Sequence, residues 1–145
     1  MKTLRNSQRG FTLIEIMVVV VILGILAAIV VPRLLDEPER ARRTSAATQI
    51  RSLEEALGMF RLDNGYYPST EQGLQALVTP PTIGRIPTRY KDGGYIRRIP
   101  DDPWGNPYVF LSPGVHGDYD LLSYGADGQS GGEGDNADIG NWNLE

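Results

Sequence analysis

Acidic side chains gather in a glycine-rich stretch near the end of the 145-residue chain, between residues 125 and 138. Its four carboxylates are Asp127, Glu133, Asp135 and Asp138, and the stretch has no Lys or Arg. Ca²⁺ prefers about six to eight hard oxygen ligands, and glycine lets the backbone turn its carbonyls toward an ion. The acid spacing of an EF-hand is absent, and a calcium nonapeptide is only half matched. The residues alone support a metal site and a solvated acidic loop equally well.

A second informative residue is Glu15, the one charged side chain in the apolar run 11–31. A carboxylate at the centre of a membrane helix costs about 2.5–3.5 kcal/mol, and less near an interface. No neighbour in the sequence supplies a cation. Glu15 is therefore either an interfacial acid with its head in water, or a docking charge that is satisfied when another subunit arrives.

Residue types that support catalysis are scarce. The chain has no cysteine and one histidine, which excludes disulfides, thiolate zinc sites, cysteine catalysis and multi-histidine metal sites. His116, Asp118 and Ser123 could be drawn as a triad, but the chain lacks a nucleophile elbow. The neighbouring acids Asp101 and Asp102 stand between prolines, which is typical of turn formers. We therefore predict that the protein is not an enzyme.

Charge and hydropathy divide the chain into regions with different roles. Residues 1–10 carry three basic side chains and no acid, whereas residues 32–145 carry 11 basic and 17 acidic ones. The formal net charge of -4 argues against a general nucleic-acid binder. The 21 residues of the run 11–31 would span about 30 Å as a helix, enough to cross a bilayer. The basic leader predicts a cytoplasmic N-terminus, with the rest of the chain outside the cytoplasm.

An ordinary secretory signal peptide is the rival interpretation of this run. Such peptides have an apolar core of about 7–15 residues followed by a polar cleavage region. Here the core is longer and runs directly into Pro32. The pattern favours a membrane helix.

The segment 32–64 continues as the amphipathic half of the helix. Its apolar residues recur at three- and four-residue steps: Ala47, Ile50, Leu53, Leu57 and Phe60. The opposite face carries polar residues: Arg42, Arg43, Gln49, Arg51, Glu55 and Arg61. Pro32 and Pro38 suggest a kink, or alternatively a new helix that starts at Pro38. Asn64 and Gly65 end the helix.

Residues 65–145 contain 22 of the 27 glycines and prolines and must be rich in turns. Ser69 and Gln72 fit a capping box that feeds a short helix. Strands are expected within 108–111, 119–124 and 137–142. The predicted fold class is α+β, with a long N-terminal helix packed on a small antiparallel sheet.

The motif Gly10-Phe11-Thr12-Leu13-Ile14-Glu15 resembles the cleavage and methylation motif of type IV pilins and their relatives. In that family a prepilin peptidase cuts after the glycine on the cytoplasmic side. The resemblance implies a cut between Gly10 and Phe11 and N-methylation of Phe11. The charged amine of one subunit would then be a partner for Glu15 of the next, which leads to the hypothesis that Glu15 drives assembly.

Later blocks resemble one branch of this superfamily, the major pseudopilins of the type II secretion system. The matching blocks are 62–68, 70–74, 102–108 and 137–142, so that the resemblance covers nearly the whole chain. It implies a pilin fold with a calcium-binding C-terminal loop. True pilins often close this loop with a disulfide, and the lack of cysteine agrees better with a pseudopilin.

The resemblance implies Ca²⁺ as the ligand of the acidic loop. Side-chain and backbone oxygens would bind it: Asp127, Asp135, Asp138, and the backbone carbonyls of Tyr124 and Gln129. Glu133 is expected to remain solvated.

The resemblance further implies a structural subunit that polymerises through its N-terminal helices into a periplasmic pseudopilus, which drives export of folded proteins across the outer membrane. Expected partners are further copies, minor pseudopilins, the inner-membrane secretion platform, the prepilin peptidase and the membrane itself. The expected location is the bacterial inner membrane, with a single span and a periplasmic C-terminal domain. The alternatives are a membrane-anchored periplasmic calcium-binding module, and a minor or type IV pilin subunit.

Overall fold

A computed structural model describes residues 10–144, and for residues 31–37 it describes the backbone alone. The predicted basic leader, apart from Gly10, lies outside the described residues. The chain forms two compact units, which divide between Pro38 and Glu39.

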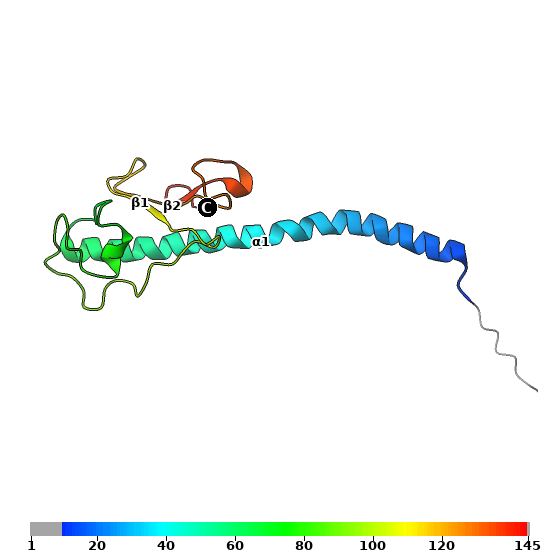
Figure 1. The fold of residues 1–145 in the computed structure, drawn as a ribbon, viewed down its shortest axis with the longest axis horizontal. Helices are drawn as coiled ribbons and strands as arrows, with labels where there is room; N and C mark the ends of the chain where they lie inside the picture. The colour runs from blue at the N-terminus through cyan, green and yellow to red at the C-terminus, as the bar shows by residue number, and fades with distance from the viewer. Residues whose placement is uncertain (1–9, 145) are drawn as a thin grey trace, which may run out of the picture. The chain divides into compact units, whose positions relative to one another are not determined.

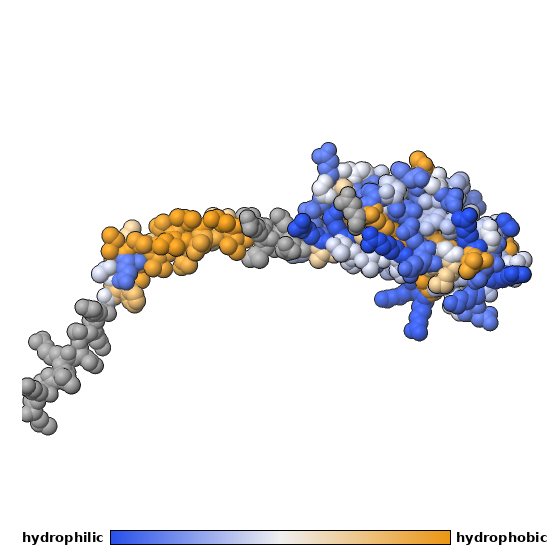
Figure 2. All heavy atoms as spheres, turned by 180° about the vertical axis from the view of Figure 1, so that it is seen from behind, coloured by the Kyte–Doolittle hydropathy of each residue, from blue (hydrophilic) through white to orange (hydrophobic). Residues whose placement is uncertain are grey.

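The first unit is helical and apolar. Helix α1, Leu13–Asn64, begins in it two residues after the start of the predicted membrane run. The stretch Leu13–Val30 is long and apolar enough to cross a membrane, and none of it is buried within the chain. On the face that Figure 2 shows, this stretch has a nearly continuous hydrophobic surface. This surface must be covered by something other than this chain, because burying so much apolar area strongly lowers the free energy.

Helix α1 runs through both Pro32 and Pro38 without interruption. One of the two interpretations of the sequence, that a separate helix begins at Pro38, is therefore wrong. The predicted end of the helix at Asn64 and Gly65 is confirmed, since α1 ends at Asn64. Gly65 follows with φ 80°, a left-handed conformation that glycine adopts without strain.

The second unit buries one stripe of α1. The stripe steps by four and three residues, and each member is at most 2% exposed: Ala46, Ile50, Leu53, Leu57 and Phe60. Ala47, which was predicted in this stripe, is only half-buried. Ala46 takes its place because it lies four residues before Ile50 and so shares the same line along the helix.

A three-stranded antiparallel sheet contributes to this core, as predicted. Strand β1, Val109–Leu111, pairs with β2, Asp120–Ser123, which pairs with β3, Ile139–Gly140. Figure 1 shows β1 and β2 beside the second half of α1, with the C-terminal segment returning close to them. Phe110, Leu121 and Ile139 from the three strands join the helix stripe in one core.

Within residues 10–144, the loops contain two short 3₁₀ helices. The helix η1, Leu74–Leu77, follows the predicted capping box, in which the Ser69 amide donates to Gln72 Oε1 at 3.1 Å and the Gln72 amide donates to Ser69 Oγ at 3.3 Å. The second, η2, Gly134–Asn136, lies within the acidic loop.

Candidate functional site

The segment around the expected cleavage point precedes the first turn of α1. Gly10 and Phe11 are not helical, and the Phe11 side chain is 78% exposed. Thr12 stands just before the helix, and its Oγ1 accepts a hydrogen bond from the Glu15 amide at 3.3 Å. The Gly10–Phe11 peptide bond, where cleavage is expected, is thus accessible and lies outside regular structure, as a peptidase substrate must be.

Glu15 closes a capping box with Thr12. Its Oε2 accepts a hydrogen bond from the Thr12 amide at 3.5 Å, the long limit for such a bond. Within residues 10–144 the Glu15 carboxylate forms no ion pair. An acid in the first helical turn also interacts favourably with the helix dipole. The Thr12-x-x-Glu15 spacing carried this signal in the sequence, but the sequence interpretation missed it.

The acidic loop joins β2 to β3 and holds the five expected metal ligands. Asp127 accepts the Gln129 amide at 3.0 Å, and Asp138 Oδ2 accepts the Gly131 amide at 2.9 Å. Asp135 lies in η2, and Tyr124 follows the last residue of β2. Gly132 has φ 85°, and a Cβ there would lie 2.5 Å from the Asn136 carbonyl oxygen, so the loop folds tightly on itself.

One carboxylate oxygen in this loop lacks a partner. Asp138 Oδ1 is inaccessible to solvent and forms no hydrogen bond. A buried polar atom without a partner typically costs about 1–3 kcal/mol, so its presence suggests a missing ligand. A cation next to this oxygen would remove that cost, and the oxygen donors of the loop fit Ca²⁺.

The side chains alone do not complete a metal site. Among residues 10–144, no three acidic or histidine side chains lie close enough together to hold an ion. The structure therefore does not bring Asp127, Asp135 and Asp138 together as a carboxylate cluster. A site in this loop requires backbone oxygens as well, such as the expected carbonyls of Tyr124 and Gln129, or water.

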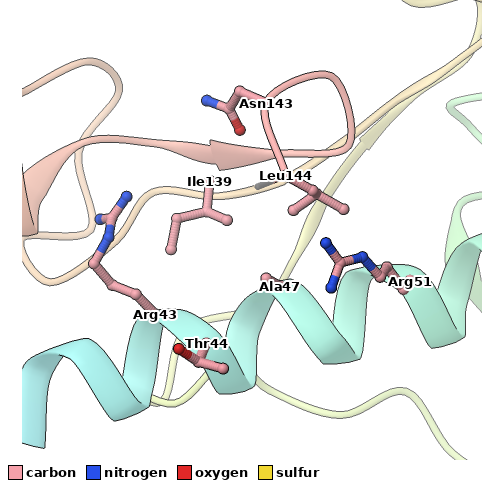
Figure 3. A pocket seen from close by; sticks show the side chains of 7 residues that line it. All are labelled: Arg43, Thr44, Ala47, Arg51, Ile139, Asn143 and Leu144. Carbon is pink, nitrogen blue, oxygen red and sulfur yellow. The ribbon is translucent and has the colours of Figure 1, made fainter.

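Arg43 of α1 contacts the same loop. Its Nη1 donates to the backbone carbonyls of Ala137 at 3.0 Å and Asp135 at 3.3 Å. It also lines a pocket of about 430 Å³ between the helix and the C-terminal segment (Figure 3), together with Thr44, Ala47, Arg51, Ile139, Asn143 and Leu144. Sequence reasoning placed Arg43 on the solvated face, and nothing in its spacing signalled these contacts.

The residues of the conceivable catalytic triad are each bonded elsewhere. His116 Nδ1 lies 3.0 Å from Asp120 Oδ2, and its ring stacks on Trp142. Ser123 Oγ donates to the buried Asp102, and Asp118 pairs with Arg61 at 3.0 Å. These contacts hold loops in place.

Asp120, the partner of His116, is held by several hydrogen bonds. It is 2% exposed and accepts the amides of Val115 at 2.9 Å and His116 at 3.0 Å. Burial by itself raises the pKa of Asp120, but the hydrogen bonds from Val115 and His116 outweigh it and lower the pKa overall. Asp120 therefore remains ionised and fixes the loop 113–118.

Comparisons with known proteins match both parts of this description. A family model described as "Type II secretion system (T2SS), protein G" matches residues 33–142, and one described as "Prokaryotic N-terminal methylation motif" matches residues 5–31. The chain is 59% identical over 145 residues to the type II secretion system core protein G of Vibrio cholerae serotype O1, covering 100% of this chain and 98% of the relative. It is 53% identical over 139 residues to the core protein G of Escherichia coli K12, covering 96% and 94%.

A solved structure is similar as well. It is the crystal structure of the major pseudopilin from the type 2 secretion system of enterohaemorrhagic Escherichia coli, with a TM-score of 0.69 and 48% sequence identity. The match covers 78% of this chain and 96% of that one.

Proposed function

Because the chain belongs to the protein G family of the type II secretion system, we propose how it works as a structural subunit of the pseudopilus. The role of structural subunit follows from the family and from the likeness to a major pseudopilin. Neither a monomeric calcium-binding module nor a minor or type IV pilin subunit is favoured by these matches. The role is mechanical and requires no substrate chemistry.

Assembly proceeds through the part of α1 that lies in the first unit. The observation that carries this proposal is the stretch Leu13–Val30, whose apolar side chains have no cover in their own chain. Lipid covers them in the single subunit, and the same helices of neighbouring copies cover them in the filament. Exchanging one apolar cover for the other costs little free energy, so polar contacts decide the register.

Glu15 provides the polar contact. A prepilin peptidase cleaves between Gly10 and Phe11, and Phe11 is then N-methylated and keeps a positive charge. This amine pairs with Glu15 of a neighbouring copy. A charge pair is stronger in a filament core than in water, although desolvation offsets part of that gain, so the pair sets register more than stability.

The acidic loop binds Ca²⁺. Asp127, Asp135 and Asp138 would hold it with the carbonyls of Tyr124 and Gln129, and the partnerless Asp138 Oδ1 supports this. When bound, the ion supplies positive charge that neutralises the carboxylates and links the two limbs of the loop. It thereby substitutes for the disulfide that a chain without cysteine cannot form.

The subunit is anchored in the inner membrane. Its N-terminus is cytoplasmic, and the second unit is periplasmic, as the charge asymmetry predicts. Its partners are minor pseudopilins and the inner-membrane secretion platform. Adding subunits extends the filament, which pushes folded cargo toward an outer-membrane pore.

Mass spectrometry of the mature protein tests the core of this proposal. The expected terminus is N-methylated Phe11, with residues 1–10 removed. A protein that forms normal filaments while keeping its leader would overturn the proposal.

A further inference from the structure

Arg43 connects α1 to the acidic loop over 92 residues of sequence. Its guanidinium donates to the carbonyls of Asp135 and Ala137. Both belong to the segment 135–138, the second limb of the loop, which ends at Asp138. Figure 3 shows the Arg43 side chain rising from α1 beside Ile139 of β3. The contact is made to the backbone of the loop and leaves the carboxylates of Asp135 and Asp138 for other partners.

The first limb of the loop, residues 125–127, packs against the same two carbonyls. The Ala126 amide donates to the Asp135 carbonyl at 3.4 Å. A Cβ on Gly125, which has φ 70°, would lie 3.0 Å from the Ala137 oxygen and 3.2 Å from the Asp135 oxygen. Arg43 and the segment 125–126 therefore hold these carbonyls between them, directly beside Asp127 on one limb and Asp138 on the other.

We propose that Arg43 is a positioning residue for the cation, which fixes the limb 135–138 and thereby raises the affinity of the loop for Ca²⁺. The inference rests on the calcium binding proposed above. A ligand's outer partners typically contribute about 10–100-fold in metal affinity because they hold the ligands in place. If Arg43 acted through its charge alone, it would lower the affinity for Ca²⁺, since a guanidinium near the ion repels it. The sign of the effect therefore separates the two roles.

The test compares variants of the full chain in detergent micelles by calorimetric titration with CaCl₂. Arg43→Met removes the charge and the hydrogen bonds, whereas Arg43→Lys keeps the charge and replaces the planar fork with one ammonium. Arg42→Met is the matched control, because Arg42 stands in the same helical turn and pairs with Glu39 instead of the loop. The melting temperature of each variant is measured with CaCl₂ and with EGTA.

We expect Arg43→Met to weaken Ca²⁺ binding by about tenfold or more, with Arg43→Lys between it and the wild type and Arg42→Met unchanged. The loss in melting temperature caused by Arg43→Met should be larger with CaCl₂ than with EGTA. Equal or tighter Ca²⁺ binding by Arg43→Met, or equal losses in both conditions, overturns the positioning role and leaves the calcium site standing. If Arg43→Met does not fold, unchanged binding by Arg43→Lys overturns it. A wild-type protein that binds no Ca²⁺ overturns both proposals.

Discussion

The indole Nε1 of Trp104 donates a hydrogen bond to Glu39 Oε1 at 2.7 Å, which joins a proline-bounded loop to α1 at the first residue of the second unit. The turn that presents Trp104 is fixed by Asp102, whose Oδ1 accepts the amides of Trp104 at 3.1 Å and Asn106 at 2.8 Å. The block 102–108 therefore holds the start of the second unit's helical segment in place.

Removing this bond should destabilise the second unit. Trp104→Phe keeps an aromatic ring but loses the donor, and we expect it to cost about 1.5–3 kcal/mol, the range for hydrogen bonds to charged groups. Chemical denaturation of Trp104→Phe, Glu39→Ala and the double variant completes a double-mutant cycle. Strictly additive losses would show that the two side chains are not coupled.

Assembly should depend on the charge of Glu15 and hardly on its capping contact. Glu15→Gln keeps an acceptor for the Thr12 amide but loses the charge, so we expect leader cleavage without filaments. Thr12→Ala is the matched control, because it removes the cap hydroxyl that accepts the Glu15 amide and leaves the carboxylate. Its filaments should form at near wild-type length, measured by negative-stain microscopy. Normal filaments from Glu15→Gln would sink the charge-pairing hypothesis.

Strong periodic signals made most of the fold predictable. The apolar stripe of α1 and the three strands follow from local patterns that the structure confirms, apart from the shift from Ala47 to Ala46. The strands came out shorter than predicted. Strand β2 begins only at Asp120, whose buried carboxylate accepts the amides of Val115 and His116, and nothing local in the sequence marks a carboxylate as buried.

The candidate site was predictable only in its residue types. The acids of the loop stand out in composition. The hydrogen bonds to the loop's backbone carbonyls, however, come from Arg43, which lies on a different element. A helical arginine that donates to distant carbonyls has the same local pattern as one in solvent. The hydrogen bond from Tyr108 to Gln49 at 2.7 Å escaped for the same reason.

Acid should weaken the second unit partly through Asp120. Because the pKa of Asp120 is lower in the folded protein than in the unfolded chain, the unfolded chain binds the proton first as the pH falls. The stabilising contribution of Asp120 is therefore complete at neutral pH and is lost below about pH 4, as the pH falls through the folded-state pKa. We expect Asp120→Asn to cost about 1.5–3 kcal/mol at pH 7. Its stability should also change less between pH 5 and pH 3 than that of the wild type. Parallel pH profiles from urea denaturation would contradict this role.

Chelation should lower the melting temperature of the full chain. A ligand at 100 times its Kd stabilises the folded state by about 2.7 kcal/mol, and EGTA removes that gain. Asp138→Asn should abolish the difference between CaCl₂ and EGTA, measured by tryptophan fluorescence on heating. Glu133→Gln is the matched control in the same loop, since Glu133 is expected to remain solvated, and it should keep the full difference. An identical melting curve for the wild type in both conditions refutes the calcium site.

Two adjacent glycines should respond differently to the same substitution. Gly93 and Gly94 have φ of 82° and 80°, so an alanine at either position enters the left-handed region at a cost of about 1–2 kcal/mol. A Cβ on Gly93 meets nothing within 4 Å, whereas one on Gly94 lies 2.6 Å from the Val78 carbonyl oxygen and 2.9 Å from that of Leu77. The Leu77 carbonyl also accepts the Tyr95 amide at 2.7 Å, so this backbone cannot retreat without breaking that bond. We expect Gly93→Ala to cost about 1 kcal/mol and Gly94→Ala at least twice as much in urea denaturation. Equal costs at the two positions would show that the segment 91–95 shifts freely away from η1.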